Sequence, residues 1–68
     1  MKTKVQIQRE FIDTLKSASI YQRSLVRREG KRRMQKALSA IGITGIAASN
    51  AIHEATEAAE MELAMREE

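Results

Sequence analysis

Apolar residues recur at three- and four-residue steps along most of the chain, which is the spacing of one face of an α-helix. In the first part of the chain these positions are Ile7, Phe11, Leu15, Ala18, Leu25 and Val26. The spacing predicts a helix over about 8–29. The pattern then continues, as a helix over about 31–41, at Met34, Ala37, Leu38 and Ile41.

Gly30 lies between these two segments, and its effect is open to two interpretations. Glycine often ends a helix in the left-handed conformation, and the preceding Arg27 and Arg28 suit the negative end of the helix dipole. A continuous helix would instead tolerate the glycine at a cost of about 1 kcal/mol. The first arm is therefore either one long helix or a helix broken at Gly30.

The strongest turn signal follows at residues 42–45, where Gly42 and Gly45 flank a threonine that can cap the next helix. From there a helical pattern predicts a helix over about 46–66. Small residues on one side of this helix are spaced to let two backbones approach closely, at Ala48, Ala51, Ala55 and Ala58. The predicted fold is all-α, a helical hairpin of two long helices with the first one open to a break at Gly30.

The chain has 68 residues, no Cys, no Trp and only two aromatic residues, so a single copy has little material for a core. Because small domains of this kind usually need outside support, we expect two copies to form a dimeric helical bundle. The residues expected at the dimer or helix-packing seam are Phe11, Leu15, Leu25, Ala48, Ala51, Ile52, Ala55, Ala58, Ala59 and Leu63.

Charge divides the chain into two unlike halves. Residues 1–36 carry eleven Lys and Arg against three acids, a net of +8, whereas residues 37–68 carry one Arg against six Glu, a net of −5. Seven cations form a basic cluster that could bind a partner or a nucleic acid, namely Arg23, Arg27, Arg28, Lys31, Arg32, Arg33 and Lys36. Such a cluster suits phosphate groups, an acidic protein surface, or the acidic helix of the same hairpin.

Catalytic chemistry finds no support in the sequence. No Ser-His-Asp or Cys-His set and no phosphate-binding glycine loop is present, so we expect a protein that is not an enzyme and has no cofactor. His53 and Glu57 have the i,i+4 spacing of half a metal site, but one histidine on an acidic helix face is more typical of surface than of a metal centre.

The sequence fits three other architectures less well. Residues 2–8 alternate as a short strand would, which is the start of a ribbon-helix-helix fold. A helix-turn-helix over 34–55 would read DNA poorly, because its second helix presents glutamates to the phosphates. Residues 37–52 are uncharged but span only about 24 Å as a helix, which is short for a bilayer of about 30 Å, so a membrane is not the expected partner.

These patterns favour a non-enzymatic interaction protein, a regulator or inhibitor that binds a larger protein partner as a homodimer. One alternative is a nucleic-acid-binding protein that uses the basic cluster over 23–36. Another is a structural subunit, in which basic and acidic halves of neighbouring copies meet. The first residues lack the apolar run of a secretory signal, so a cytoplasmic location is expected.

Overall fold

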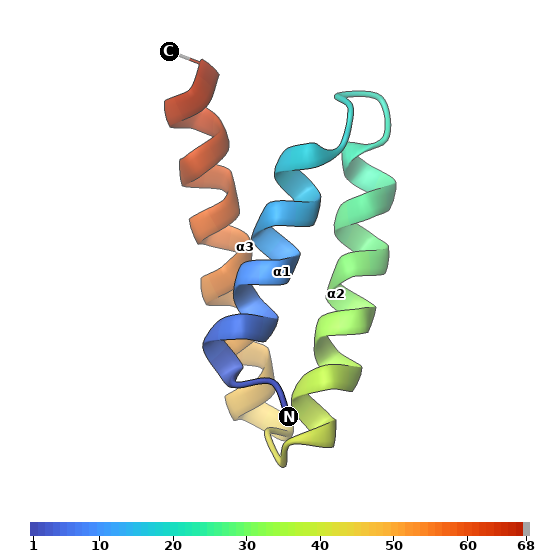
Figure 1. Cartoon of the computed structure of the whole chain (residues 1–68), viewed down its shortest axis with the longest axis vertical. Helices are drawn as coiled ribbons and strands as arrows, with labels where there is room; N and C mark the ends of the chain where they lie inside the picture. Colours follow the sequence, from blue (N-terminus) through green and yellow to red (C-terminus); the bar gives the residue numbers. More distant parts are fainter. Residues whose placement is uncertain (68) are drawn as a thin grey trace.

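The computed structural model describes residues 1–67, with side chains as far as Met65. It contains three helices, α1 (Lys4–Ser17), α2 (Arg23–Ala40) and α3 (Gly45–Glu67). No strand occurs in this range. Figure 1 shows an up-down-up bundle in which α1 and α3 run in the same direction, α2 runs in the opposite one, and α1 packs along both of the others.

The all-α prediction is confirmed, but the predicted hairpin of two long helices is wrong, because the segment expected as a helix over about 8–29 is broken. Helix α1 ends at Ser17, and Ala18 is extended, with φ −74° and ψ 145°. The Gln22 N–H then donates to the Ser19 carbonyl, which closes a turn before α2 begins. The first arm is therefore broken twelve residues before Gly30, and the chain reverses direction here as well as at the expected turn over 42–45.

The local sequence explains this break. A continued apolar stripe would need an apolar side chain at position 22, where the chain has Gln22. By turning here, the chain folds α2 back against α1, which buries more apolar surface than one long helix could.

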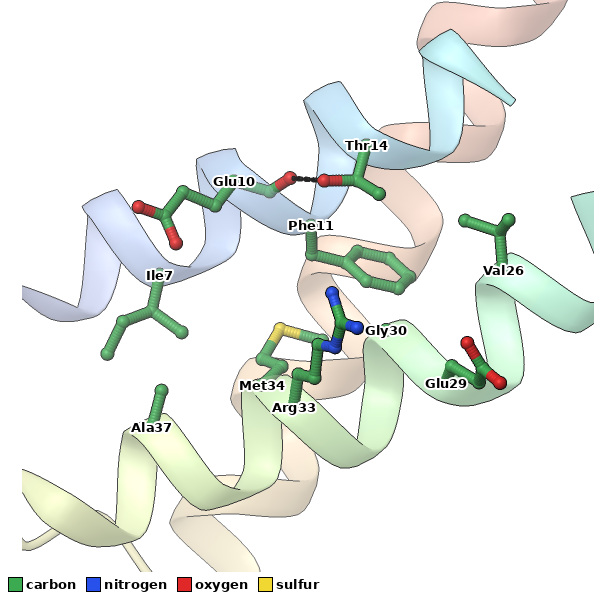
Figure 2. A pocket seen from close by; sticks show the side chains of 10 residues that line it. All are labelled: Ile7, Glu10, Phe11, Thr14, Val26, Glu29, Gly30, Arg33, Met34 and Ala37. Atoms are coloured by element: carbon green, nitrogen blue, oxygen red, sulfur yellow. Dashed lines mark hydrogen bonds between the residues drawn. The ribbon is translucent and has the colours of Figure 1, made fainter.

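Gly30 lies inside α2, so of the two interpretations of this glycine the break is wrong and the continuous helix is right at this position. The glycine serves close packing instead. A Cβ atom at position 30 would lie 2.8 Å from Cδ2 and 2.9 Å from Cε2 of Phe11, closer than real side chains approach. Figure 2 shows the Phe11 ring reaching from α1 toward α2 at this point.

Helix α1 begins at Lys4, so the strand interpretation of residues 2–8 is wrong. Its start is fixed by a capping box. The Gln6 N–H donates to the Thr3 hydroxyl at 3.2 Å, and the Thr3 N–H donates to the Gln6 side-chain oxygen at 2.8 Å. These two bonds satisfy groups that the first helical turn otherwise leaves without partners.

The connection between α2 and α3 uses the two glycines of the 42–45 segment. Gly42 has φ 87° and Gly45 has φ 61°, both in the left-handed region that favours glycine. Helix α3 then begins at Gly45, one residue before the expected start. This tight connection brings α3 back antiparallel to α2 (Figure 1).

The core lies where the three helices meet and is built from aliphatic side chains, one aromatic ring and several alanines. Among the described side chains, no polar or charged residue is buried. The Gln8 side chain donates to the Ala51 carbonyl at 2.8 Å, a contact possible only because α1 passes directly over the small residues of α3. The buried residues are Ile7, Phe11, Ile12, Leu15, Met34, Leu38, Ala48, Ala51, Ala55, Ala59 and Leu63.

Candidate functional site

Five cations on α2 form the most strongly charged surface of the described chain, and we call it the basic face. Arg28, Arg32 and Lys36 follow one another at four-residue steps, which places them in one row on the helix. All three are exposed, and the row lies opposite the buried side chains of α2. Lys31 and Arg33 flank the row on its two sides, as the 100° spacing of helical residues requires.

The cations of the basic face form no ion pairs with the acids of α3, because those acids contact other residues. Glu54 lies 3.7 Å from Lys4 of α1, and Glu60 lies 3.8 Å from Arg27. Glu62 is held by two further cations of α1. Within residues 1–65, no ion pair joins any acid to the five cations of the basic face.

The remaining two residues of the predicted basic cluster lie apart from this face. Arg27 is half-buried and pairs with Glu60 across the junction of α2 and α3. Arg23 is also half-buried near the start of α2 and makes interactions of its own. The seven clustered cations thus divide into Arg23 and Arg27, which make interactions within the fold, and the five of the basic face, of which four are exposed and Lys31 is half-buried.

An ionic contact with three charged hydrogen bonds joins α1 to α3. Nη1 and Nη2 of Arg9 donate to the two carboxylate oxygens of Glu62 at 2.9 and 3.0 Å, and Lys16 Nζ donates at 3.0 Å. These hydrogen bonds, Arg9 first, lower the pKa of Glu62 despite partial desolvation, and the same bond to Glu62 raises the pKa of Arg9. The Glu62 carboxylate therefore links α1 to α3 through charged hydrogen bonds and does not serve as a reactive acid.

The expected packing seam lies mostly inside the single chain. Of its members, Phe11, Leu15, Ala48, Ala51, Ala55, Ala59 and Leu63 are buried, and Ile52 and Ala58 are partly buried against them. Leu25 departs from the rest, because it is 50% exposed beside the basic face. Ile12, which the sequence pattern did not single out, lies in the core as well.

A groove of about 230 Å³ runs between α1 and α2 (Figure 2). Its floor is apolar and includes Phe11 and Met34. Charged side chains of both signs line it as well, with Glu10 on α1 and Glu29 and Arg33 on α2. No local pattern in the sequence predicts this groove, because it arises where Gly30 allows α1 and α2 to approach.

The described residues offer no arrangement for metal chemistry. His53 Nε2 lies 3.0 Å from a Glu57 carboxylate oxygen, and both side chains are exposed. No group of three or more His, Cys, Asp or Glu residues that could hold a metal ion occurs in the described part of the chain.

Within residues 1–67, none of the helices combines the length and the apolar character that crossing a bilayer requires.

Comparison with known proteins returned nothing similar: no protein-family model matches the chain, and no curated protein or solved structure is significantly similar to it.

The structure also reveals an apolar tip that the sequence pattern misplaced. Ile20 and Tyr21 lie in the turn between α1 and α2, outside any helix, with 70% and 95% of their surfaces exposed. The absence of a helical register at Gln22 was the available signal for this turn. The tip lies at the end of α2 from which the basic face extends (Figure 1).

Proposed function

We propose that this chain is a binding protein, not an enzyme, and that its basic face docks onto the phosphate backbone of a nucleic acid. The observation that carries the proposal is a set of five cations, four of them exposed, that form no ion pair with an acid within residues 1–65. Cations that stabilise a fold are normally paired, as Arg9 and Arg27 are here. Surplus charge gathered on one face is instead typical of a polyanion-binding surface.

The composition of the basic face favours phosphate over a protein surface. The centres of protein interfaces are depleted in charged residues and enriched in aromatic ones. Along the row of Arg28, Arg32 and Lys36, the neighbouring exposed positions are mainly polar, and Leu25 is the one large apolar side chain among them. Guanidinium groups present a planar fork that matches phosphate oxygens, so the arginines suit backbone contacts.

Titration of labelled oligonucleotides, followed by fluorescence anisotropy at several salt concentrations, tests the proposal. Each cation that meets a phosphate releases a counterion, so affinity falls as salt rises. If all five cations engage, we expect affinity to drop roughly 100- to 500-fold between about 50 and 200 mM salt. Binding that is absent at low salt, or that does not respond to salt, would refute the proposal.

Two variants of equal charge separate the basic face from net charge. Arg28→Gln with Arg32→Gln removes two cations from the face, and Lys2→Gln with Lys4→Gln removes two from the start of the chain. Lys2 and Lys4 are exposed and pair only with exposed glutamates. We expect the first pair to weaken binding strongly and to reduce the salt dependence, whereas the second pair leaves both nearly unchanged. Equal losses would show that only net charge matters.

A second candidate is a regulator that binds a larger protein with an acidic surface, and half-exposed Leu25 favours it. Arginines are enriched among the residues that dominate protein interfaces, and Leu25 adds an apolar contact beside them. Here Leu25→Ala would weaken binding as much as loss of Arg28, while oligonucleotides would not compete. Sedimentation of the same sample measures whether a homodimer forms, which must then use surfaces other than the alanines already packed inside the chain.

A further inference from the structure

The apolar tip formed by Ile20 and Tyr21 has no packing role in the described fold. Tyr21 is 95% exposed and Ile20 70% exposed, and neither belongs to the core. A single exposed apolar residue is ordinary on a protein surface. Tyr21 is distinguished by its position, two residues before the start of the helix that carries the basic face.

Tyr21 and the basic face follow one another along the bundle. Arg28 lies five residues into α2, roughly 8 Å along the helix axis from Arg23, and Lys36 lies roughly 12 Å beyond Arg28. Along the helix axis, an exposed aromatic residue therefore precedes the row of cations. Sequence-tolerant binding of single strands combines the same two parts, an aromatic platform for bases and a basic track for the backbone.

The acids that border α2 disfavour a duplex. The major groove of DNA is about 12 Å wide and holds a helix between two rows of phosphates, so both flanks of α2 would meet negative charge. Glu29 lies on the α1 side of the face, where it lines the groove, and Glu60 lies on the α3 side. A single strand following the central row stays clear of Glu60 and meets Glu29 only at the edge of the row, three residues before Arg32.

We propose that the ligand of the basic face is single-stranded nucleic acid, with Tyr21 stacked on an unpaired base while Arg28, Arg32 and Lys36 hold the backbone. This inference rests on the proposed function and narrows it to one class of nucleic acid. It also makes Tyr21 a binding residue, a role that the charge pattern alone does not suggest.

Intrinsic fluorescence gives a direct measurement, because the chain has one Tyr and no Trp. The full-length chain is titrated with a single-stranded oligonucleotide, the matching duplex, and vesicles containing phosphatidylserine. We expect the single strand to quench Tyr21 emission and to bind more tightly than the duplex. Competition with the labelled single strand then reports the affinity of each Tyr21 variant.

Three substitutions distinguish stacking from general apolar contact. Tyr21→Phe keeps a ring and should retain most of the affinity. Tyr21→Leu and Tyr21→Ala should each lose roughly 5- to 150-fold, the range for removing one base–aromatic stack. Because the side chain lies outside the core, circular dichroism should be the same for all three variants.

The other outcomes are equally decisive. Salt-dependent binding with unchanged Tyr21 emission, equal affinity for strand and duplex, and no effect of Tyr21→Ala would overturn this inference and leave the proposed function intact. A fluorescence response to the vesicles but to neither oligonucleotide would overturn both in favour of an anionic membrane surface. Full affinity in Tyr21→Leu would show apolar contact in place of stacking.

Discussion

The ring of Phe11 lies against the backbone of Gly30, so closely that a Cβ atom there would come within 2.8 Å of the ring. Phe11 is 5% exposed and is the one aromatic residue of the core. This contact sets how near α1 and α2 approach, and it explains a glycine in the middle of an 18-residue helix. The usual cost of about 1 kcal/mol for glycine in a helix is offset by burial of the ring.

Gly30→Ala should therefore destabilise the protein, although alanine is the better helix former. The gain in helix propensity is about 1 kcal/mol, whereas a methyl group forced into a packed contact costs about 1–3 kcal/mol. We expect a net loss of about 1 kcal/mol in the free energy of unfolding, measured by urea denaturation.

A double-mutant cycle identifies the cause. Phe11→Leu removes the ring that the new methyl group would meet, so Gly30→Ala should cost less in that background and even stabilise the helix. The same loss with and without the ring would locate the effect elsewhere in α2.

Glu62 should make stability depend on pH at the acid end. Its pKa is lower in the folded chain, chiefly because Arg9 and Lys16 donate hydrogen bonds to it. The unfolded chain therefore binds this proton more readily, so the stabilisation is complete above the usual carboxyl pKa and is lost as pH falls through the lower, folded value. We expect the free energy of unfolding to fall less steeply below about pH 5 in Glu62→Gln than in the wild type.

Glu54→Gln is the matched control, because Glu54 is also on α3 but contacts α1 more weakly, at 3.7 Å from Lys4 and 3.5 Å from Gln8. The Glu54→Gln variant should keep most of the wild-type decrease in the free energy of unfolding at low pH. If both variants follow the wild-type curve, the hydrogen-bonded carboxylate of Glu62 contributes nothing to acid unfolding.

The sequence was sufficient for features that depend on neighbours within one or two helical turns. Apolar spacing predicted an all-helical fold, and the paired glycines at 42 and 45 predicted the turn that precedes α3. It was insufficient for the break after Ser17, because a stripe with one polar gap at Gln22 fits either a long helix or two short ones. The function of Gly30 depends on a ring nineteen positions away, which no local pattern reports.

The candidate site was likewise predictable from the sequence only in part. Clustering of positive charge over 23–36 is visible in the sequence, but which cations stay available depends on three-dimensional neighbours. Arg27 is drawn to Glu60 of α3, while Arg28 beside it faces solvent. Glu62 interrupts the apolar pattern of its own helix, and only the fold shows that Arg9, 53 positions away, accounts for it.

Ala51 should tolerate no larger side chain. It is fully buried, and its carbonyl accepts a hydrogen bond from Gln8 of α1. Ala51→Leu would force α1 and α3 apart, at a cost of about 1–3 kcal/mol or more, which lowers the melting temperature by roughly 4–8 °C for each kcal/mol.

The same substitution at Ala47 serves as the control, since Ala47 is exposed on α3 one turn earlier. Ala47→Leu should change the free energy of unfolding by no more than about 0.5 kcal/mol. Similar losses at the two positions would mean that close packing of small residues does not hold these helices together.

Neutralising the basic face should leave the fold as stable as before, or more so. Arg28, Arg32 and Lys36 are like charges at i,i+4 spacing, and each such pair on a helix costs roughly 0.2–0.5 kcal/mol. No acid within residues 1–65 forms an ion pair with them. The triple change Arg28→Gln, Arg32→Gln and Lys36→Gln should thus raise the free energy of unfolding by about 0.5–1 kcal/mol at low salt.

Salt gives this prediction a second test, because the Debye screening length shortens to about 3 Å at 1 M salt, which removes the repulsion between the three cations. The gain should then disappear, whereas Arg9→Gln should be destabilising at low salt because it deprives Glu62 of its main donor. A protein that becomes more stable when it loses its binding charges retains them for a ligand, since the fold does not need them. Destabilisation by the triple change at every salt concentration would instead assign these cations to the fold and remove the premise of the proposed function.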